Sequence, residues 1–292
     1  MSQESSNHLR NPSPPQRFTK ARAAFFDQLE RDTAQLSQVR SASVTSPSEM
    51  QLDWKTLVSD LLNYDTDLDR AVHAGTHIAN FAGISQIQDL RALMRINDPF
   101  VMGVIAEPLA RLQGPQALPL LFQALRCLEL EGADSAHIAG MIAHVVRSQP
   151  VQSWQMLMHL LGDSNAAIRR DAVWAMSFLP TQMALPPLLG MLRDARVEVR
   201  VVATNTLKHF CTPVVIDALC GALRDWEPEV RCAAAGALGW IGNPRTMHVL
   251  AAARTDQDPL VRAFVHEALQ RISAYQSQSQ SQSQSQSKQA RV

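Results

Sequence analysis

Two stretches of the chain, 31 residues apart, carry the same pattern and decide the fold. Residues 193–207 read RDARVEVRVVATNTL, and residues 224–238 read RDWEPEVRCAAAGAL. Each contains an aspartate, then a valine-arginine pair, then small residues and a closing leucine. A pattern that recurs at a fixed interval of this length indicates a repeat architecture, in which each repeat buries its apolar face only against its neighbours.

The period extends over four repeats. Arginines recur every 31 residues, and aspartates recur at the same interval, each six residues before an arginine. Small or apolar residues follow each arginine at the third, sixth and seventh positions, which places them on one face of a helix. A second apolar helical stretch precedes each aspartate, so we expect two antiparallel helices in each repeat. The aspartates are Asp163, Asp194, Asp225 and Asp256, and the arginines are Arg169, Arg200, Arg231 and Arg262.

Towards the N-terminus the pattern becomes weaker but persists. The segment that begins at Asn97 keeps the Asp-Pro-x-Val motif and a closing Leu109, whereas Met102 stands where the arginine is expected. About 220 residues lie between Trp54 and Ser273, which corresponds to about seven helix pairs at this period. We therefore predict an all-α protein, an α-solenoid over residues 51–273, with degenerate terminal repeats.

The two ends of the chain differ from the repeats in composition. Residues 1–17 are polar and rich in proline and serine, and residues 274–292 are rich in glutamine and serine, so we expect both to be disordered. Apolar residues at helical spacing predict an amphipathic helix over residues 18–40. A serine- and proline-rich linker, residues 41–50, follows it.

Composition limits the partners that we expect. The 27 basic and 27 acidic residues give a formal net charge of zero, so the chain as a whole does not attract nucleic acid or anionic membranes. No apolar run is long enough for a membrane span, and the N-terminus lacks the apolar core of a signal peptide. We expect a cytoplasmic protein with a protein partner, no nucleic acid and no membrane.

The four cysteines occupy apolar helical stretches without the spacing of a disulfide framework, and we expect reduced thiols in the core. A zinc site formed by His209 with Cys211, Cys220 and Cys232 is an alternative, but the spacings fit no usual ligand signature. The cysteines are Cys127, Cys211, Cys220 and Cys232.

The motif Asp-x-x-x-x-Val-Arg-x-x-Ala-x-x-Ala-Leu resembles the HEAT-like repeats of phycobilisome lyases. The resemblance is specific from Asp163 to Ser273 and weak over residues 54–162. It implies that the valine and alanine columns pack the core. It also implies that the aspartate and arginine columns form a structural ladder along the stack.

HEAT-like families include enzymes, and the residues present favour a different function. Deoxyhypusine hydroxylases hold a di-iron centre through several His-Glu pairs, but this chain has one such pair, His266-Glu267, which supplies two ligands of about six. HEAT-like DNA glycosylases use cationic surfaces, which a neutral chain does not favour. We expect no catalytic residue, metal or cofactor. A bilin-lyase-like or other small-molecule role remains the alternative.

In such stacks the second helix of each repeat lines the concave face, so its exposed positions predict a partner-binding surface. Small residues from Cys232 to Gly239 would form a smooth apolar floor, flanked by Trp174 and Trp240, that suits a helix or an extended peptide. Packing between repeats is an equal alternative for Trp240 and the favoured one for Phe178. The predicted contact residues are Trp174, Asn205, Ala233, Gly236, Trp240, His266 and Glu267.

Trp226 lies in the turn between the two helices of its repeat. Either its ring folds back over the next repeat, or it is an exposed contact residue. With no convergent acid, base, nucleophile or metal set in the sequence, the function that we predict is a non-enzymatic protein-binding scaffold that uses its concave face.

Overall fold

The structure is a computed structural model that describes residues 53–289. The predicted disordered segment 1–17, the helix 18–40 and the linker 41–50 lie outside the described residues. Within residues 53–289 the protein consists of helices and connecting turns, without a β-strand. No helix of this part is long and apolar enough to cross a membrane.

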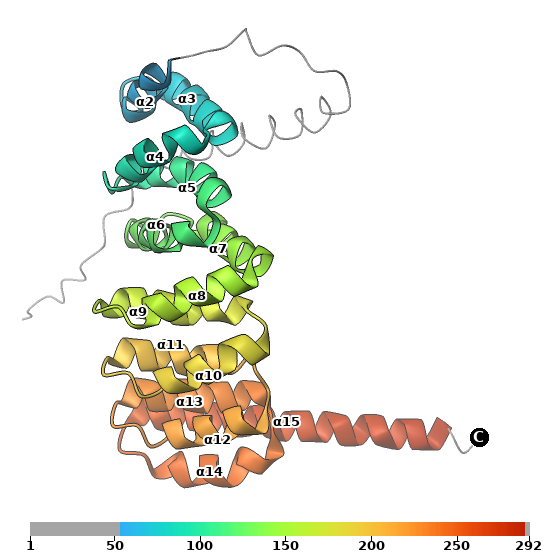
Figure 1. Cartoon of the computed structure of the whole chain (residues 1–292). Helices are drawn as coiled ribbons and strands as arrows, with labels where there is room; N and C mark the ends of the chain where they lie inside the picture. Colours follow the sequence, from blue (N-terminus) through green and yellow to red (C-terminus); the bar gives the residue numbers. More distant parts are fainter. Residues whose placement is uncertain (1–52, 290–292) are drawn as a thin grey trace, which may run out of the picture. The chain divides into compact units, whose positions relative to one another are not determined.

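Over the described residues 53–289 the helices alternate as the first and second members of seven pairs, which confirms the α-solenoid of helix pairs predicted from the period (Figure 1). The first helices are α2 (Trp54–Leu62), α4 (Ile87–Met94), α6 (Leu118–Leu130), α8 (Pro150–Leu161), α10 (Thr181–Met191), α12 (Pro213–Ala222) and α14 (Met247–Ala252). The second helices are α3 (Leu68–Phe81), α5 (Pro99–Gln113), α7 (Ala136–Ser148), α9 (Ala166–Ala175), α11 (Val197–Leu207), α13 (Pro228–Ile241) and α15 (Pro259–Gln289). Short 3-10 turns are η1 (Ile84–Gln86), η2 (Gly114–Ala117), η3 (Met176–Phe178), η4 (Pro244–Thr246) and η5 (Ala253–Thr255).

The chain divides into two compact units, and the division falls within α7, between Val145 and Val146. Unit 1 contains α2 to α6, and unit 2 contains α8 to α15. The sequence predicts a single solenoid over residues 51–273, because the 31-residue period does not mark this boundary. All four arginine-aspartate repeats lie in unit 2.

In unit 2 the second helices α9, α11, α13 and α15 contact one another in order along the stack. The alanines three residues after the arginines, Ala172, Ala203 and Ala234, are fully buried between them. Small residues permit the closest approach, since a Cβ atom placed on Gly239 of α13 would lie 2.7 Å from the Cα atom of Ala268 in α15. The small-residue columns of the repeat therefore set the spacing of the second helices.

Local sequence determines where these helices begin and end. Asp258 caps α15, because its carboxylate accepts hydrogen bonds from the backbone N–H groups of Leu260 (2.8 Å) and Val261 (3.2 Å), and Pro259 occupies the first helical position. Gly242 ends α13 in the left-handed conformation, with a φ of 70°.

An indole from α8 completes the hydrogen bonding of α10. Pro187 lies inside α10 and has no N–H group for the carbonyl of Met183, four residues earlier. The indole Nε1 of Trp154 in α8 donates to that carbonyl at 3.1 Å. The proline is thus tolerated because a neighbouring repeat supplies the missing donor.

In unit 1 the core is apolar where unit 2 has arginines. Met102 is fully buried in α5, which contacts α3, α4 and α6. Arg111 of the same helix donates from Nη2 to the carbonyls of Ala79 (2.9 Å) and Ala82 (3.2 Å) at the end of α3. These bonds satisfy carbonyls that a helix leaves without partners at its C-terminus.

The last helix differs from the prediction for its segment. The backbone of α15 continues to Gln289, whereas the sequence analysis expects disorder over residues 274–292. Glutamine is a good helix former, and no glycine or proline interrupts the helix after Pro259. The hydroxyl of Ser277 donates to the carbonyl of Ser273 at 3.1 Å, a bond that holds serine within a helix.

Candidate functional site

The arginines and aspartates of unit 2 form bidentate ion pairs between successive repeats. Three of the four guanidinium groups each donate from Nε and Nη2 to both oxygens of an aspartate 25 residues later, in the next repeat. This geometry gives strong charge-assisted hydrogen bonds. The pairs are Arg169 with Asp194, Arg200 with Asp225, and Arg231 with Asp256, with all distances between 2.8 and 2.9 Å.

Each guanidinium also binds the turn of its own repeat. In Arg200, Nη1 donates to the backbone carbonyl of Asp194 at 3.0 Å, so the arginine's own aspartate supplies a carbonyl and not a carboxylate. Asp225 in turn accepts at Oδ1 from the backbone N–H of Glu227 at 2.9 Å. One arginine therefore connects the inter-helix turns of two repeats.

The ion pairs shift the protonation equilibria of their members. The guanidinium of Arg169 holds the pKa of Asp194 below its usual value, and Arg231 does the same to the pKa of Asp256. Hydrogen bonds to the charged form produce such shifts. Arg262 donates only to the carbonyls of Asp256 and Gln257, and among the described residues no carboxylate pairs with it.

Trp226 contacts an arginine of the preceding repeat. Its side chain is 70% exposed, and the guanidinium carbon of Arg200 lies 4.1 Å from the centroid of its ring. The sequence left two alternatives for Trp226, a ring folded over the next repeat or an exposed contact residue. Neither describes it fully, because the ring is exposed and packs on the preceding repeat rather than the next one. A cation over an indole ring is a favourable contact that holds the exposed Trp226 in place.

Aromatic side chains project from the second helices and contact neighbouring side chains. Trp240 of α13 is 57% exposed, with Lys208 Nζ at 5.6 Å from its ring centroid. Trp174 of α9 is half-buried and meets Phe178 edge to face at 5.1 Å. The guanidinium carbon of Arg147 lies over the Phe178 ring, 5.0 Å from its centroid.

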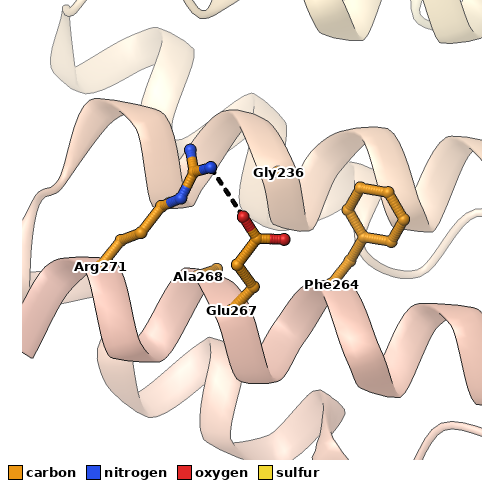
Figure 2. Close-up of a pocket in the computed structure, with 6 residues that line it drawn as sticks. Gly236, Phe264, Glu267, Ala268 and Arg271 are labelled. Atoms are coloured by element: carbon orange, nitrogen blue, oxygen red, sulfur yellow. Dashed lines mark hydrogen bonds and ion pairs between the residues drawn. The ribbon is translucent and has the colours of Figure 1, made fainter.

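A small pocket of about 90 Å³ lies between α13 and α15 (Figure 2). Phe264, Glu267 and Arg271 form a row along α15 beside Gly236, and Glu267 pairs with Arg271 at 2.6 Å. The expected smooth floor is thus partly covered, because Phe264 of the next repeat would lie 3.6 Å from a Cβ atom on Gly236. Phe264 is not among the contact residues predicted from the sequence. Its position two residues after Arg262, on the second helix of the repeat, is the feature that could have identified it.

Comparison with known proteins identifies the repeat type. A family profile described as HEAT repeats matches residues 185–270. Residues 185–270 are thus HEAT repeats. The finer resemblance to phycobilisome lyases stays a prediction. No curated protein matches the chain.

Solved structures with similar architecture cover most of the chain. Human deoxyhypusine hydroxylase in complex with glycerol is 17% identical and covers 76% of this chain and 96% of its own, with a TM-score of 0.39. An engineered protein is 16% identical, with coverages of 76% and 99% and a TM-score of 0.42. A designed armadillo repeat protein in complex with the peptide (KR)4 is 19% identical, with coverages of 75% and 99% and a TM-score of 0.38.

The HEAT repeats bring together only part of the predicted contact surface. Gly236 and Glu267 line the pocket, whereas the other five predicted residues lie on the second helices outside it. His266 is exposed, and its Nε2 lies 2.9 Å from Nε2 of Gln270, whereas Glu267 pairs with Arg271. The residues outside the pocket are Trp174, Asn205, Ala233, Trp240 and His266.

The cysteines of the HEAT repeats are free thiols, and three of them are partly buried. Cys211 is exposed in the turn after α11, contrary to the expectation of a core position. Burial raises the pKa of the Cys232 thiol, which disfavours the reactive thiolate. Within the described residues no group of three histidine, cysteine or acidic side chains lies close enough to hold a metal ion.

Proposed function

We propose that the HEAT repeats of unit 2 bind a protein partner, either a helix or an extended peptide, on the exposed side of the second helices. This second-helix face contains the residues predicted from the sequence, together with Phe264. Exposed aromatic side chains beside a small residue carry the proposal: Trp240 is 57% exposed and Phe264 is 40% exposed, with Gly236 near both in the fold. Such aromatic anchors are typical of interface hot spots. The second-helix face comprises Trp174, Asn205, Ala233, Gly236, Trp240, Phe264, His266 and Glu267.

The contacts around these rings support a preorganised surface. Trp240 is restrained by Lys208, and Trp174 by Phe178, although water still reaches the rings. An anchor that already has its bound orientation loses less side-chain entropy on association. A partner therefore gains from burying these rings without first ordering them.

Charge on this face also favours a neutral or mixed partner. Glu267 and Arg271 neutralise each other across one helical turn. The second helices of unit 2 contact one another more closely than its first helices do, which supports their placement on the inner side of the stack. A helix or peptide seated there would cross several repeats.

Paired substitutions test the proposal. Ala233→Arg with Gly236→Arg introduces two long cations into the second-helix face, and we expect the co-purifying partner to be lost from a tagged, full-length protein. Gly190→Arg is the matched control, since Gly190 is an exposed helical glycine of α10 with no atom within 4 Å of an added Cβ.

Mass spectrometry identifies the bound protein, and circular dichroism checks that the variants stay folded. Retention of the same partner by the folded double variant would contradict the proposal. An absorption spectrum of the eluate covers the alternative role: a coloured eluate without a stoichiometric protein would favour pigment handling over scaffolding.

A further inference from the structure

A second surface of unit 2 lies on the first helices, away from the second-helix face. A groove of about 470 Å³ runs between α10 and α12. Its lining includes apolar and small residues from both helices, together with two arginines, an aspartate and a tryptophan. The lining residues are Leu189, Leu192, Arg193, Ala218, Gly221, Ala222, Arg224, Asp225 and Trp226.

The repeat geometry creates this groove. The second helices α11 and α13 pack closely through small residues, whereas the first helices α10 and α12 have few contacts with each other. Gly221 and Ala222 contribute little side-chain volume on the α12 side. The wider spacing of the first helices thus leaves a groove between two adjacent HEAT repeats.

The uncompensated charge at the groove is positive. Arg193 and Arg224 are exposed, and neither guanidinium forms an ion pair or hydrogen bond with any described residue. Asp225 also lines the groove, but Arg200 binds both of its oxygens and the N–H of Glu227 contacts one of them. Its negative charge is therefore already neutralised within the protein.

Trp226 supplies an apolar wall that has a fixed position. The ring is 70% exposed on the groove side, and the Arg200 guanidinium lies 4.1 Å from its centroid. Since Arg200 is itself buried and bound to two turns, the ring rests on a rigid support. A large exposed indole beside small residues forms a seat for a bulky apolar side chain.

We propose that this groove binds an extended acidic peptide that carries a bulky apolar residue between its carboxylates. Arg193 and Arg224 occupy the same position in adjacent repeats, as the Leu-Arg-Asp sequence at 192–194 and 223–225 shows. Closely packed helices lie about 8–10 Å apart and α10 and α12 have few contacts, so carboxylates at this separation or somewhat more fit both arginines. Residues three apart in a polyproline II segment meet this spacing, because its rise is about 3.1 Å per residue.

The same features favour a peptide over a nucleic acid. Nucleic acid binding draws its affinity from many phosphate contacts along a basic surface. The groove has two unpaired cations, and α12 carries the exposed acidic Asp217 next to the lining residue Ala218. A short acidic peptide needs only these two arginines and the Trp226 seat.

Fluorescence anisotropy of the full-length protein tests the proposal. The probe is a fluorescein-labelled peptide of sequence Gly-Glu-Pro-Leu-Glu-Pro-Leu-Glu-Gly, and we expect saturable, salt-sensitive binding. Arg193→Gln and Arg224→Gln should each weaken binding roughly tenfold, and Trp226→Ala should do the same. Arg254→Gln removes an equally exposed arginine outside the groove and should leave the affinity unchanged.

Two matched peptides and one oligonucleotide sharpen the outcome. Replacing each glutamate by glutamine, or each leucine by serine, should abolish binding, because the groove needs both chemistries. Binding that survives the double variant Arg193→Gln with Arg224→Gln, binding of the glutamine peptide with equal affinity, or no binding of the probe at all would overturn the proposal. Binding of oligothymidylate in place of the peptide would overturn it in favour of nucleic acid. The Ala233 and Gly236 double variant should bind the probe normally, which separates this surface from the second-helix face.

Discussion

Units 1 and 2 place different chemistry at the same position of the repeat. In unit 2 this position holds an arginine, which in three repeats is ion-paired to the next repeat, and the Arg200 side chain is 1% exposed. In unit 1 the equivalent residue is Met102, also fully buried, and Ile96 stands where the motif has its aspartate. Both chemistries fill the space between helices, but the arginine alone also binds two inter-helix turns.

Unit 1 does connect a turn to the preceding repeat, by another route. The hydroxyl of Tyr64 donates to Asp98 at 2.7 Å, and Asp98 caps α5 by accepting from the N–H of Val101 at 2.9 Å. An aspartate at the turn is thus common to both units, and its partner from the preceding repeat differs. Both units therefore have a contact between an aspartate of an inter-helix turn and a side chain of the preceding repeat, although the residue types differ.

The largest expected effect comes from breaking one arginine-aspartate ion pair between repeats. Arg200→Ala should lower the free energy of unfolding of unit 2 by about 3 kcal/mol, because Asp225 would remain nearly buried without its partner. Denaturant titration, with hydrogen exchange of the amides in α11 and α13 to localise the loss, measures the effect.

Replacing the two charged residues of this ion pair by apolar residues, as in unit 1, serves as the control. Arg200→Met with Asp225→Leu removes both charges, and we expect it to recover most of the lost stability, since apolar replacements of buried pairs are often neutral. If Arg200→Ala alone changed nothing, the arginines would have to serve a purpose other than holding the turns.

The close approach of α13 and α15 gives the next effect. Gly239→Ala should destabilise unit 2 by about 1–3 kcal/mol, because its Cβ atom would meet the backbone of Ala268 at 2.7 Å. Gly236→Ala is the matched control on the same helix, with 3.6 Å of room to Phe264, and should be neutral or slightly stabilising. Equal melting temperatures for the two variants would refute the close packing.

The indole of Trp154 should show a smaller effect. Trp154→Phe removes the donor to the Met183 carbonyl and should cost about 1 kcal/mol in unfolding free energy. Adding Pro187→Ala restores a backbone N–H for that carbonyl, so the double variant should lose less than the sum of the two single changes. Thermal melts of the four proteins in this cycle measure the coupling. Strictly additive effects would contradict the role of Trp154 as donor to the Met183 carbonyl.

The smallest effects appear at opposite ends of the pH scale. Ion pairing lowers the pKa of Asp194, so its contribution to unit 2 is complete above the unfolded pKa of about 3.9 and is lost as pH falls through the lowered value. Burial, aided by Asp98, raises the pKa of Tyr64, so unit 1 loses stability as pH rises above the unfolded value of about 10. Asp194→Asn and Tyr64→Phe should flatten the acid and alkaline limbs respectively, as followed by hydrogen exchange in each unit.

The 31-residue period made the architecture predictable, but it did not predict most of the contacts between repeats. The repeat interval predicts the helix pairs and identifies the arginine and aspartate columns, because these are properties of one repeat copied along the chain. The pairing of Arg169 with Asp194, 25 residues later, depends on how repeats stack. The same holds for Phe264 beside Gly236 and for Trp226 beneath Arg200.

The groove between α10 and α12 was also beyond sequence reasoning. Its Leu-Arg-Asp signal is visible twice in the sequence, but the distance between two first helices is not a property of any single repeat. The extent of α15 escaped for another reason, since the low complexity of its serine and glutamine residues does not distinguish a helix from a disordered tail.

The direction of the ladder has a consequence for how the protein is made. Every rung joins an arginine to an aspartate that lies 25 residues further along the chain. As the polypeptide leaves the ribosome, each guanidinium must therefore wait for the following repeat before its partner arrives, and synthesis delivers 5–20 residues per second on the order of magnitude. The repeats of Arg169, Arg200 and Arg231 are consequently joined to their successors only after those successors have been synthesised, and the translation rate sets the interval during which each of these arginines remains unpaired.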